Sequence, residues 1–186
     1  GNDRMPFYFT QIAPYGYFNP DAPDAGYMMW AQAQTLEMIP YSGMAATHDV
    51  GEVNCIHPAD KKSVGDRLAF LALVNDYGYE GIDAATPIPI DFKFEEGQAI
   101  VTFEAGYMGL SPLSKDVDGF ELAGEDGIFY PAKGIVLWNN PKKVLVYKCP
   151  QVQKPVAVRY GMKYCSEATV FNCFGAPISP LRSDNY

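Results

Sequence analysis

The sequence predicts two structural parts: an α/β part with parallel strand pairing over residues 1–82, and an antiparallel β-sandwich or jelly-roll-like part over residues 83–186. Three observations predict this arrangement. Apolar runs of strand length alternate with segments of helical period in the first part. Strict apolar–polar alternation dominates the second part, in short runs separated by Gly, Pro and Asn. The change of pattern after Gly81 places the boundary near residues 80–86.

Two strands are expected in the first part. The apolar run over residues 5–13 (MPFYFTQIA) is typical of a strand that is covered on both faces, as in parallel sheets. A shorter run over residues 43–50 (GMAATHDV) predicts a second strand.

Each of these strands is followed by a segment of helical period. From about residue 27 to 39, Met29, Ala33 and Leu36 fall on one stripe, and Asp24 is a plausible cap. A second helix is expected from about residue 59 to 77, with apolar residues at the spacing of one helical face: Val64, Leu68, Leu71 and Ala72.

The second part begins with the clearest strand pattern. Ile88, Ile90, Phe92 and Phe94 face one way, and the alternation resumes after Gly97, which we expect to adopt a positive φ in a hairpin turn. Six further strand-like runs follow between residue 119 and the C-terminus. This spacing predicts the antiparallel module.

Two parallel strands make a poor domain on their own. A strand covered on both faces needs more neighbouring strands and helices than this length supplies. We therefore expect the sheet to be completed by an N-terminal half of a longer protein or by a second chain.

Composition excludes several classes of function. The net charge is −8 and the basic residues are scattered, so nucleic acid is not an expected partner. No apolar run approaches the roughly 20 residues that span a bilayer, so no membrane is expected. The four cysteines show no metal-ligand spacing with either histidine, and we expect no metal or cofactor. Buried thiols are expected, with a Cys165–Cys173 bridge as the alternative.

His57 is the first candidate for catalysis. It follows the second strand and precedes Pro58 and the second helix, and ligands of α/β sheets bind beyond the carboxyl ends of strands. The positive end of a helix dipole favours neutral imidazole, which is the form that a general base needs. The alternative is a loop histidine that only ties down the start of the helix.

A catalytic base needs a partner that orients it. Asn54 precedes His57 by three residues, and Asp49 is the nearest carboxylate at the end of a strand. The alternative interpretation of Asp49 is a turn residue at the end of the strand. His48 points to the opposite face from Asp49 and is expected to be structural.

Substrate-binding candidates follow the first strand at its carboxyl end: Gln11, Tyr15 and Tyr17. The alternative is a packed loop. In the second part, four residues are candidates for contact with a sugar or a carboxylate, with a structural role as the alternative: Trp138, Arg159, Tyr160 and Arg182.

Several stretches resemble the sialate O-acetylesterase family. They are MPFYFTQIAPYGYF, SGMAATHDVG, NCIHPADKKSVGDRLAFLAL and the closing PVAVRYGM and FNCFGAPISPLRSD. The resemblance implies that residues 1–82 are the C-terminal portion of an SGNH-hydrolase-like esterase domain and that residues 83–186 are a β-sandwich accessory domain. It also implies an extracytoplasmic location, in the periplasm or outside the cell.

By this resemblance the enzyme hydrolyses O-acetyl esters of sialic acid or related sugars through an acyl-enzyme on a serine. His57 matches the catalytic histidine and Asp49 a strand-end aspartate of the family. Related enzymes have an aspartate where this chain has Asn54, and often another where it has Cys55, so the third member of the triad stays open. The block that carries the family's serine is absent. We therefore expect a histidine-bearing fragment that is inactive alone, with a non-catalytic carbohydrate-binding or structural module as the alternative.

Overall fold

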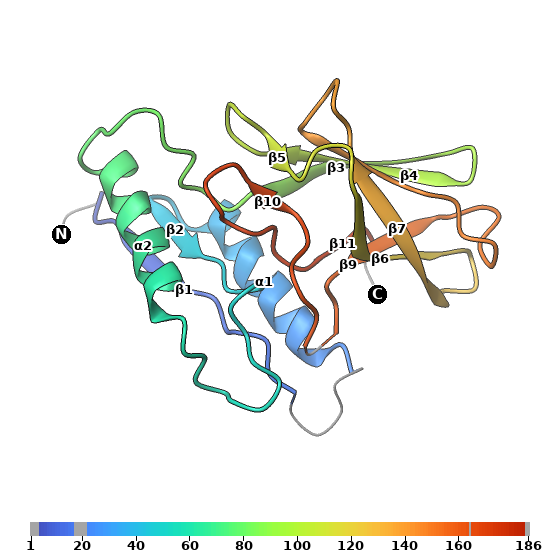
Figure 1. The fold of residues 1–186 in the computed structure, drawn as a ribbon, viewed down its shortest axis with the longest axis horizontal. Helices are drawn as coiled ribbons and strands as arrows, with labels where there is room; N and C mark the ends of the chain where they lie inside the picture. The colour runs from blue at the N-terminus through green and yellow to red at the C-terminus, as the bar shows by residue number, and fades with distance from the viewer. Residues whose placement is uncertain (1–3, 17–21, 164, 185–186) are drawn as a thin grey trace.

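The computed structural model describes residues 4–16, 22–163 and 165–184 (Figure 1). Two helices and a short parallel strand pair form one side of the molecule, and a curved antiparallel sheet forms the other. The elements are β1 (Phe7–Thr10), α1 (Asp24–Met38), β2 (Ser42–Ala45), α2 (Lys61–Asn75), β3 (Ile88–Glu95), β4 (Gln98–Glu104), β5 (Leu110–Ser111), β6 (Asp116–Ala123), β7 (Phe129–Val136), β8 (Lys143–Val146), β9 (Ala157–Tyr160), β10 (Phe171–Asn172) and β11 (Leu181–Arg182).

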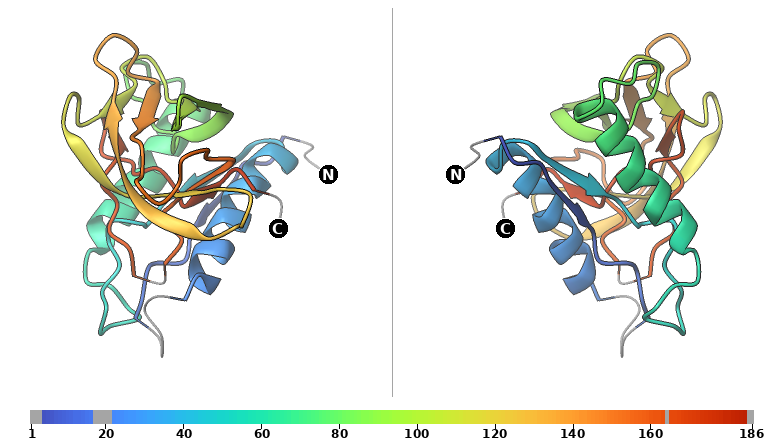
Figure 2. Two further views of the ribbon diagram at one scale, coloured as in Figure 1. Left: turned by 90° about the vertical axis from the view of Figure 1, so that its right-hand side faces the viewer. Right: turned by 90° about the vertical axis from the view of Figure 1, so that its left-hand side faces the viewer.

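β1 pairs in parallel with β2, with Phe7 opposite Ser42 and Thr10 opposite Ala45. Figure 2 shows α1 and α2 on opposite sides of this pair. Both helices lie close to where their periodicity predicts them. The expected cap at Asp24 is absent, because Pro23 precedes the helix and Asp24 is its first residue, whereas Asp60 caps α2 by accepting a hydrogen bond from the Ser63 N–H at 3.0 Å.

β1 is less covered than its apolar sequence predicts. β2 is the strand that pairs with it among the described residues, and none of its four residues is fully buried. Met5 and Phe7 remain 72% and 53% exposed. The apolar run therefore leaves an apolar surface beside β1 instead of forming a central strand.

The predicted fold class is wrong. A parallel SGNH-like sheet is not present in the described residues, where parallel pairing is confined to the four-residue β1–β2 ladder and two isolated bridges. The second part is not a sandwich of two large sheets: seven strands form one antiparallel sheet in the order β11-β9-β6-β7-β8-β4-β3. This sheet curls toward a barrel (Figures 1 and 2).

The curl explains how one sheet makes a core by itself. Side chains on its inner face pack together, including Phe103 from β4, Phe120 from β6, Val144 from β8 and Tyr160 from β9. Alternation along each strand predicts which face is apolar but not how many sheets share that face. The sequence therefore predicts the strands, but it does not predict that they curl into one barrel-like sheet.

The β3–β4 hairpin confirms the turn prediction. Its loop is Glu96-Gly97, with φ of 51° and 79°, so both residues adopt the left-handed conformation of a two-residue hairpin turn. Gly97 is thus required for its backbone freedom.

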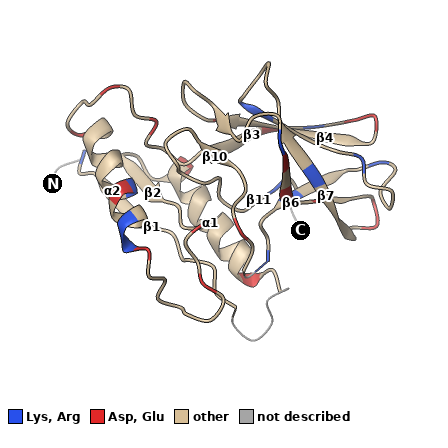
Figure 3. Ribbon diagram, viewed as in Figure 1, with Lys and Arg blue, Asp and Glu red and all other residues tan. Residues whose placement is uncertain are grey.

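The division at residues 80–86 stays a prediction. The C-terminal segment of the second part contacts the first part. Gln11 Nε2 donates to Ser179 Oγ at 2.6 Å, and the Arg67 guanidinium donates to the Gly175 carbonyl at 2.8 Å. β11 also packs against α1. Figure 3 shows acidic and basic residues scattered over both sides of this contact.

Candidate active site

The candidate site lies at the carboxyl end of the β1–β2 pair. The segments that leave the two strands, 11–16 and 46–60, extend the parallel pairing through a bridge between Tyr15 and Glu52, and the Gly16 N–H donates to the Val53 carbonyl at 3.0 Å. A Cβ on Gly16 would lie 2.6 Å from the Val53 oxygen, and one on Gly51 would lie 2.4 Å from the Pro14 oxygen. Glycine at both positions allows the two backbones to approach.

A cavity of about 420 Å³ opens at this edge. Pro14 comes from the first segment, and His48, Asp49, Gly51 and Val53 come from the second. Residues 165–168, which are far away in the sequence, form the remaining wall together with Phe171. Three segments thus enclose a space of the size that small-molecule sites have, roughly 300–1,000 Å³.

His57 lies on the second segment with an exposed side chain on a fixed backbone. Glu52 Oε1 accepts from the Ala59 N–H at 2.6 Å, and Cys55 Sγ donates to the His57 carbonyl at 3.2 Å. Asp60 then caps α2. Within the described part of the chain, the His57 imidazole makes no hydrogen bond, so both ring nitrogens are accessible to a substrate or to another polypeptide segment.

Asp49 is paired with Arg67 and not with His57. Both carboxylate oxygens accept from the guanidinium, at 2.7 Å and 2.5 Å, and Arg67 also donates to the Ala46 carbonyl at 2.7 Å. Bidentate pairing of this kind is strong and directional. Asp49 and Arg67 therefore hold the end of β2 against α2. A catalytic role for Asp49 stays a prediction.

The remaining predicted site residues are spread over different depths. Asn54 is exposed on the same loop as His57. Gln11 is 2% exposed, and its amide donates to the Met29 carbonyl and to Ser179, beneath the site. Tyr15 is half-buried at the bridge to Glu52. Tyr17 lies outside the described residues.

His48 is fully buried, as expected of a structural histidine. Nδ1 lies 3.3 Å from the Ile178 carbonyl, to which it donates, so Nε2 accepts from the Ser166 hydroxyl at 2.7 Å. That hydroxyl also lies 3.0 Å from the Gly161 carbonyl. Burial lowers the pKa of His48 to about 4, although the Ile178 carbonyl and Asp49 favour its charged form. No sequence pattern links His48 to Ser166, because 118 residues separate them.

The serine hydroxyls near the candidate site have other partners. Ser63 Oγ donates to Asp60 at 2.6 Å, Ser166 pairs with His48, and Ser179 accepts from Gln11. In the described ranges, no serine is hydrogen-bonded to His57. These ranges also contain no group of three acidic, His or Cys residues placed to hold a metal, and all four cysteines are free. None of the described helices is long and apolar enough to cross a membrane.

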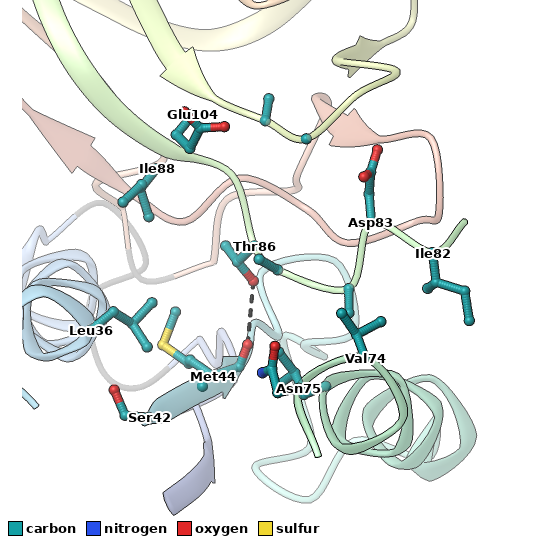
Figure 4. A pocket seen from close by; sticks show the side chains of 16 residues that line it. Leu36, Ser42, Met44, Val74, Asn75, Ile82, Asp83, Thr86, Ile88 and Glu104 are labelled. Atoms are coloured by element: carbon teal, nitrogen blue, oxygen red, sulfur yellow. Dashed lines mark hydrogen bonds between the residues drawn. The ribbon is translucent and has the colours of Figure 1, made fainter. Parts of the chain in front are cut away.

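Another cavity of about 420 Å³, called the β2-edge cavity, lies beside β2 (Figure 4). Leu36, Met44 and Val74 give it apolar walls, and Thr86 Oγ1 donates to the Met44 carbonyl at 3.4 Å. Its residues from β2 are Ser42, Gly43 and Met44, whereas the first cavity is lined by residues that follow the carboxyl end of β2, as His57 does. The first cavity is therefore the better candidate for catalysis.

The aromatic and arginine candidates of the second part have mainly structural contacts. Arg159 and Arg182 both pair with Asp184, at 2.6 Å and 2.7 Å. Tyr160 is fully buried, and its hydroxyl accepts from the Thr169 N–H. Trp138 is 76% exposed.

Comparison with known proteins gives one informative similarity. Neither protein-family models nor curated proteins match the chain. Among solved structures, the chain is similar to a carbohydrate acetylesterase from Xanthomonas citri, with a TM-score of 0.87 and 30% sequence identity. The similarity covers 98% of this chain and 42% of that one, so the chain spans less than half of that enzyme's length.

This similarity supports a protein of the carbohydrate esterase kind. It does not extend to the narrower prediction of a sialate O-acetylesterase.

Proposed function

We propose that this chain is the histidine-bearing part of a carbohydrate acetylesterase that removes O-acetyl groups from sialic acid or a related sugar. The observation that carries the proposal is the likeness, along almost the whole chain, to the Xanthomonas citri carbohydrate acetylesterase. An exposed histidine on a fixed loop is consistent with that chemistry, although His57 is not among the residues that line the cavity.

In the proposed reaction His57 moves the protons. It accepts the proton of a serine hydroxyl while the serine oxygen attacks the acetyl carbonyl, and it then donates this proton to the departing sugar oxygen. The deacetylated sugar leaves, and the acetyl group stays on the serine. His57 next takes a proton from water, whose oxygen attacks the acyl-enzyme, and acetate is released as the serine regains its proton.

The neighbours of His57 have supporting roles in this proposal. Asn54 orients the imidazole from the same loop. Asp49 acts through Arg67, because their ion pair fixes the strand end from which the loop departs. Tyr15 and Tyr17 contact the sugar, and Gln11 supports their segment from below through its contacts with Met29 and Ser179.

The nucleophilic serine is proposed to come from an N-terminal half of the protein or from a second chain. The apolar surface around Met5 and Phe7 and the outer edge of β1 are suited to such a partner. A strand added there would pair with the backbone edge of β1 that has no partner strand among the described residues, and would cover these side chains.

The test is acetate release from an O-acetylated sugar, assayed with the longest polypeptide that the reading frame encodes. His57→Ala should lower kcat/KM by about 10³-fold or more. The matched control is Ile56→Ala, which alters the exposed neighbour of His57 on the same loop and should leave kcat/KM unchanged. A His57→Ala variant that is folded and fully active would refute the proposed role.

A non-catalytic carbohydrate-binding or structural module is the second candidate. It is favoured by the described serines around the site, whose hydroxyls are engaged with partners other than His57. Acetate release by these 186 residues alone tests whether the chain contains its own nucleophile. We expect none from the isolated chain, and turnover would mean that it contains its own nucleophile.

A further inference from the structure

We propose that a cavity on the face of β6 and β7 opposite the core, called the second cavity from here on, binds neutral sugars next to the acetylated one, so that the substrate is an oligosaccharide or polysaccharide. The inference rests on the proposed function and extends its substrate. The cavity has a volume of about 450 Å³ and is walled by β6, β7, residues 161–163 and Ser166. This volume lies within the usual range of ligand sites, roughly 300–1,000 Å³.

Ser166 joins this cavity to the candidate active site. It lines both cavities, and its hydroxyl is anchored on His48 at 2.7 Å. Gly161 lines the second cavity and packs so closely on His48 that an added Cβ would lie 2.3 Å from the imidazole Cε1. The two cavities therefore meet at Ser166, and the proposal requires one extended ligand to pass over this residue and contact both.

Glu121 supplies the strongest acceptor in the second cavity. It alternates along β6 with the core residues Phe120 and Leu122, so its carboxylate lies on the opposite face. Arg159, its neighbour across from β9, donates instead to Asp184, at 3.2 Å and 2.6 Å. Glu121 accepts no hydrogen bond from the residues that the structure describes. Sugar hydroxyl groups are donors that suit such a carboxylate.

The charges around the cavity favour a neutral ligand. Asp118 and Glu121 contribute two carboxylates, and Lys133 and Lys163 contribute two ammonium groups. Lys133 and Asp118 lie 3.4 Å apart and offset each other. An anionic or cationic ligand would gain little net attraction here, whereas a polyhydroxylated one finds both donors and acceptors.

Glu121 is retained at a cost to folding. Its partial burial raises the pKa of the carboxyl, although Lys163 and Arg159 act in the opposite direction. A carboxylate that is disfavoured by its surroundings destabilises the folded protein at neutral pH. Such a cost is understandable if the carboxylate serves a ligand.

The test is calorimetric titration of the chain with a neutral acetylated oligosaccharide and with its acetylated monosaccharide. The oligosaccharide should bind at least about tenfold more tightly, and Glu121→Gln should raise its dissociation constant about tenfold, because hydrogen bonds to charged groups are strong. Glu125→Gln, on the exposed turn between β6 and β7, is the matched control and should bind like the unchanged chain.

Thermal unfolding of both variants shows whether they are folded, and Glu121→Gln should melt no lower than the unchanged chain. Equal affinity of Glu121→Gln and the unchanged chain for the oligosaccharide would overturn the proposal, as would equal affinity for the two sugars or no binding. Acetate release, assayed separately, tests the proposed esterase activity. Binding by the chain, without hydrolysis by the longest polypeptide that the reading frame encodes, would therefore refute that activity and leave the second cavity as a sugar site.

Discussion

At the scale of single residues, His48 makes stability depend on pH. Its pKa is about 4 in the folded protein and about 6.5 when unfolded. Because folding lowers the pKa of His48, its contribution to the free energy of unfolding is complete above pH 6.5. This contribution is lost as the pH falls from 6.5 toward 4. We expect chemical denaturation to show a loss of about 2 kcal/mol from this residue by about pH 5. His48→Gln should lack this component, and identical pH profiles for the two proteins would contradict it.

The ion pair of Asp49 with Arg67 is a second residue-scale prediction. The two side chains are 20% and 9% exposed, and Arg67 also donates to two backbone carbonyls. Arg67→Met would leave the Asp49 carboxylate unpaired and should cost about 3 kcal/mol in the free energy of unfolding. Urea denaturation measures it.

Lys62→Met is the matched control on the same helix. Lys62 forms an exposed ion pair with Asp66, and exposed pairs contribute little. No measurable loss of stability is expected there. If Arg67→Met were as mild, the pair would not be what holds the end of β2.

At the scale of elements, the turn that follows β9 depends on one glycine. Gly161 has a φ of 65°, and an added Cβ would lie 2.3 Å from the His48 ring. Gly161→Ala should therefore cost both backbone strain and the close contact, in total about 2 kcal/mol or more. Gly78→Ala has a similar φ of 68° but open space around it, and should cost only about 1 kcal/mol. Equal midpoints of urea denaturation for the two variants would contradict this packing.

The helices and the β3–β4 hairpin could be predicted because their signals are local. Helical period locates α1 and α2 to within a few residues, and Glu96-Gly97 marks its turn. The order of strands in the antiparallel sheet is not local: β9 pairs with β6 and β11, and β7 separates β6 from β8. Alternation contains no information on these partners, which is why the predicted sandwich was wrong.

For the candidate site, too, local features could be predicted from the sequence and long-range contacts could not. His57, Asn54 and Asp49 could be singled out because each follows β2 within a short stretch. The pairing of Asp49 with Arg67, and that of His48 with Ser166, depends on contacts across 18 and 118 residues. Spacing alone predicts neither contact. The position of Gln11 at the end of a strand also does not predict that its side chain is buried.

At the scale of the whole molecule, an incomplete strand pair with apolar residues exposed beside β1 is joined to a complete antiparallel core. The chain covers 42% of the Xanthomonas citri enzyme that it resembles. Both facts are consistent with the proposal that a further segment is needed for catalysis. This segment would add strands to β1 and supply a serine to the loop of His57.

The most direct measurement is acetate release from an O-acetylated sugar by the longest polypeptide of this reading frame, with and without His57→Ala. The account predicts that the unchanged protein turns over and that His57→Ala, folded and still able to bind sugar, is slower by about 10³-fold or more. Equal rates for the two proteins would contradict it.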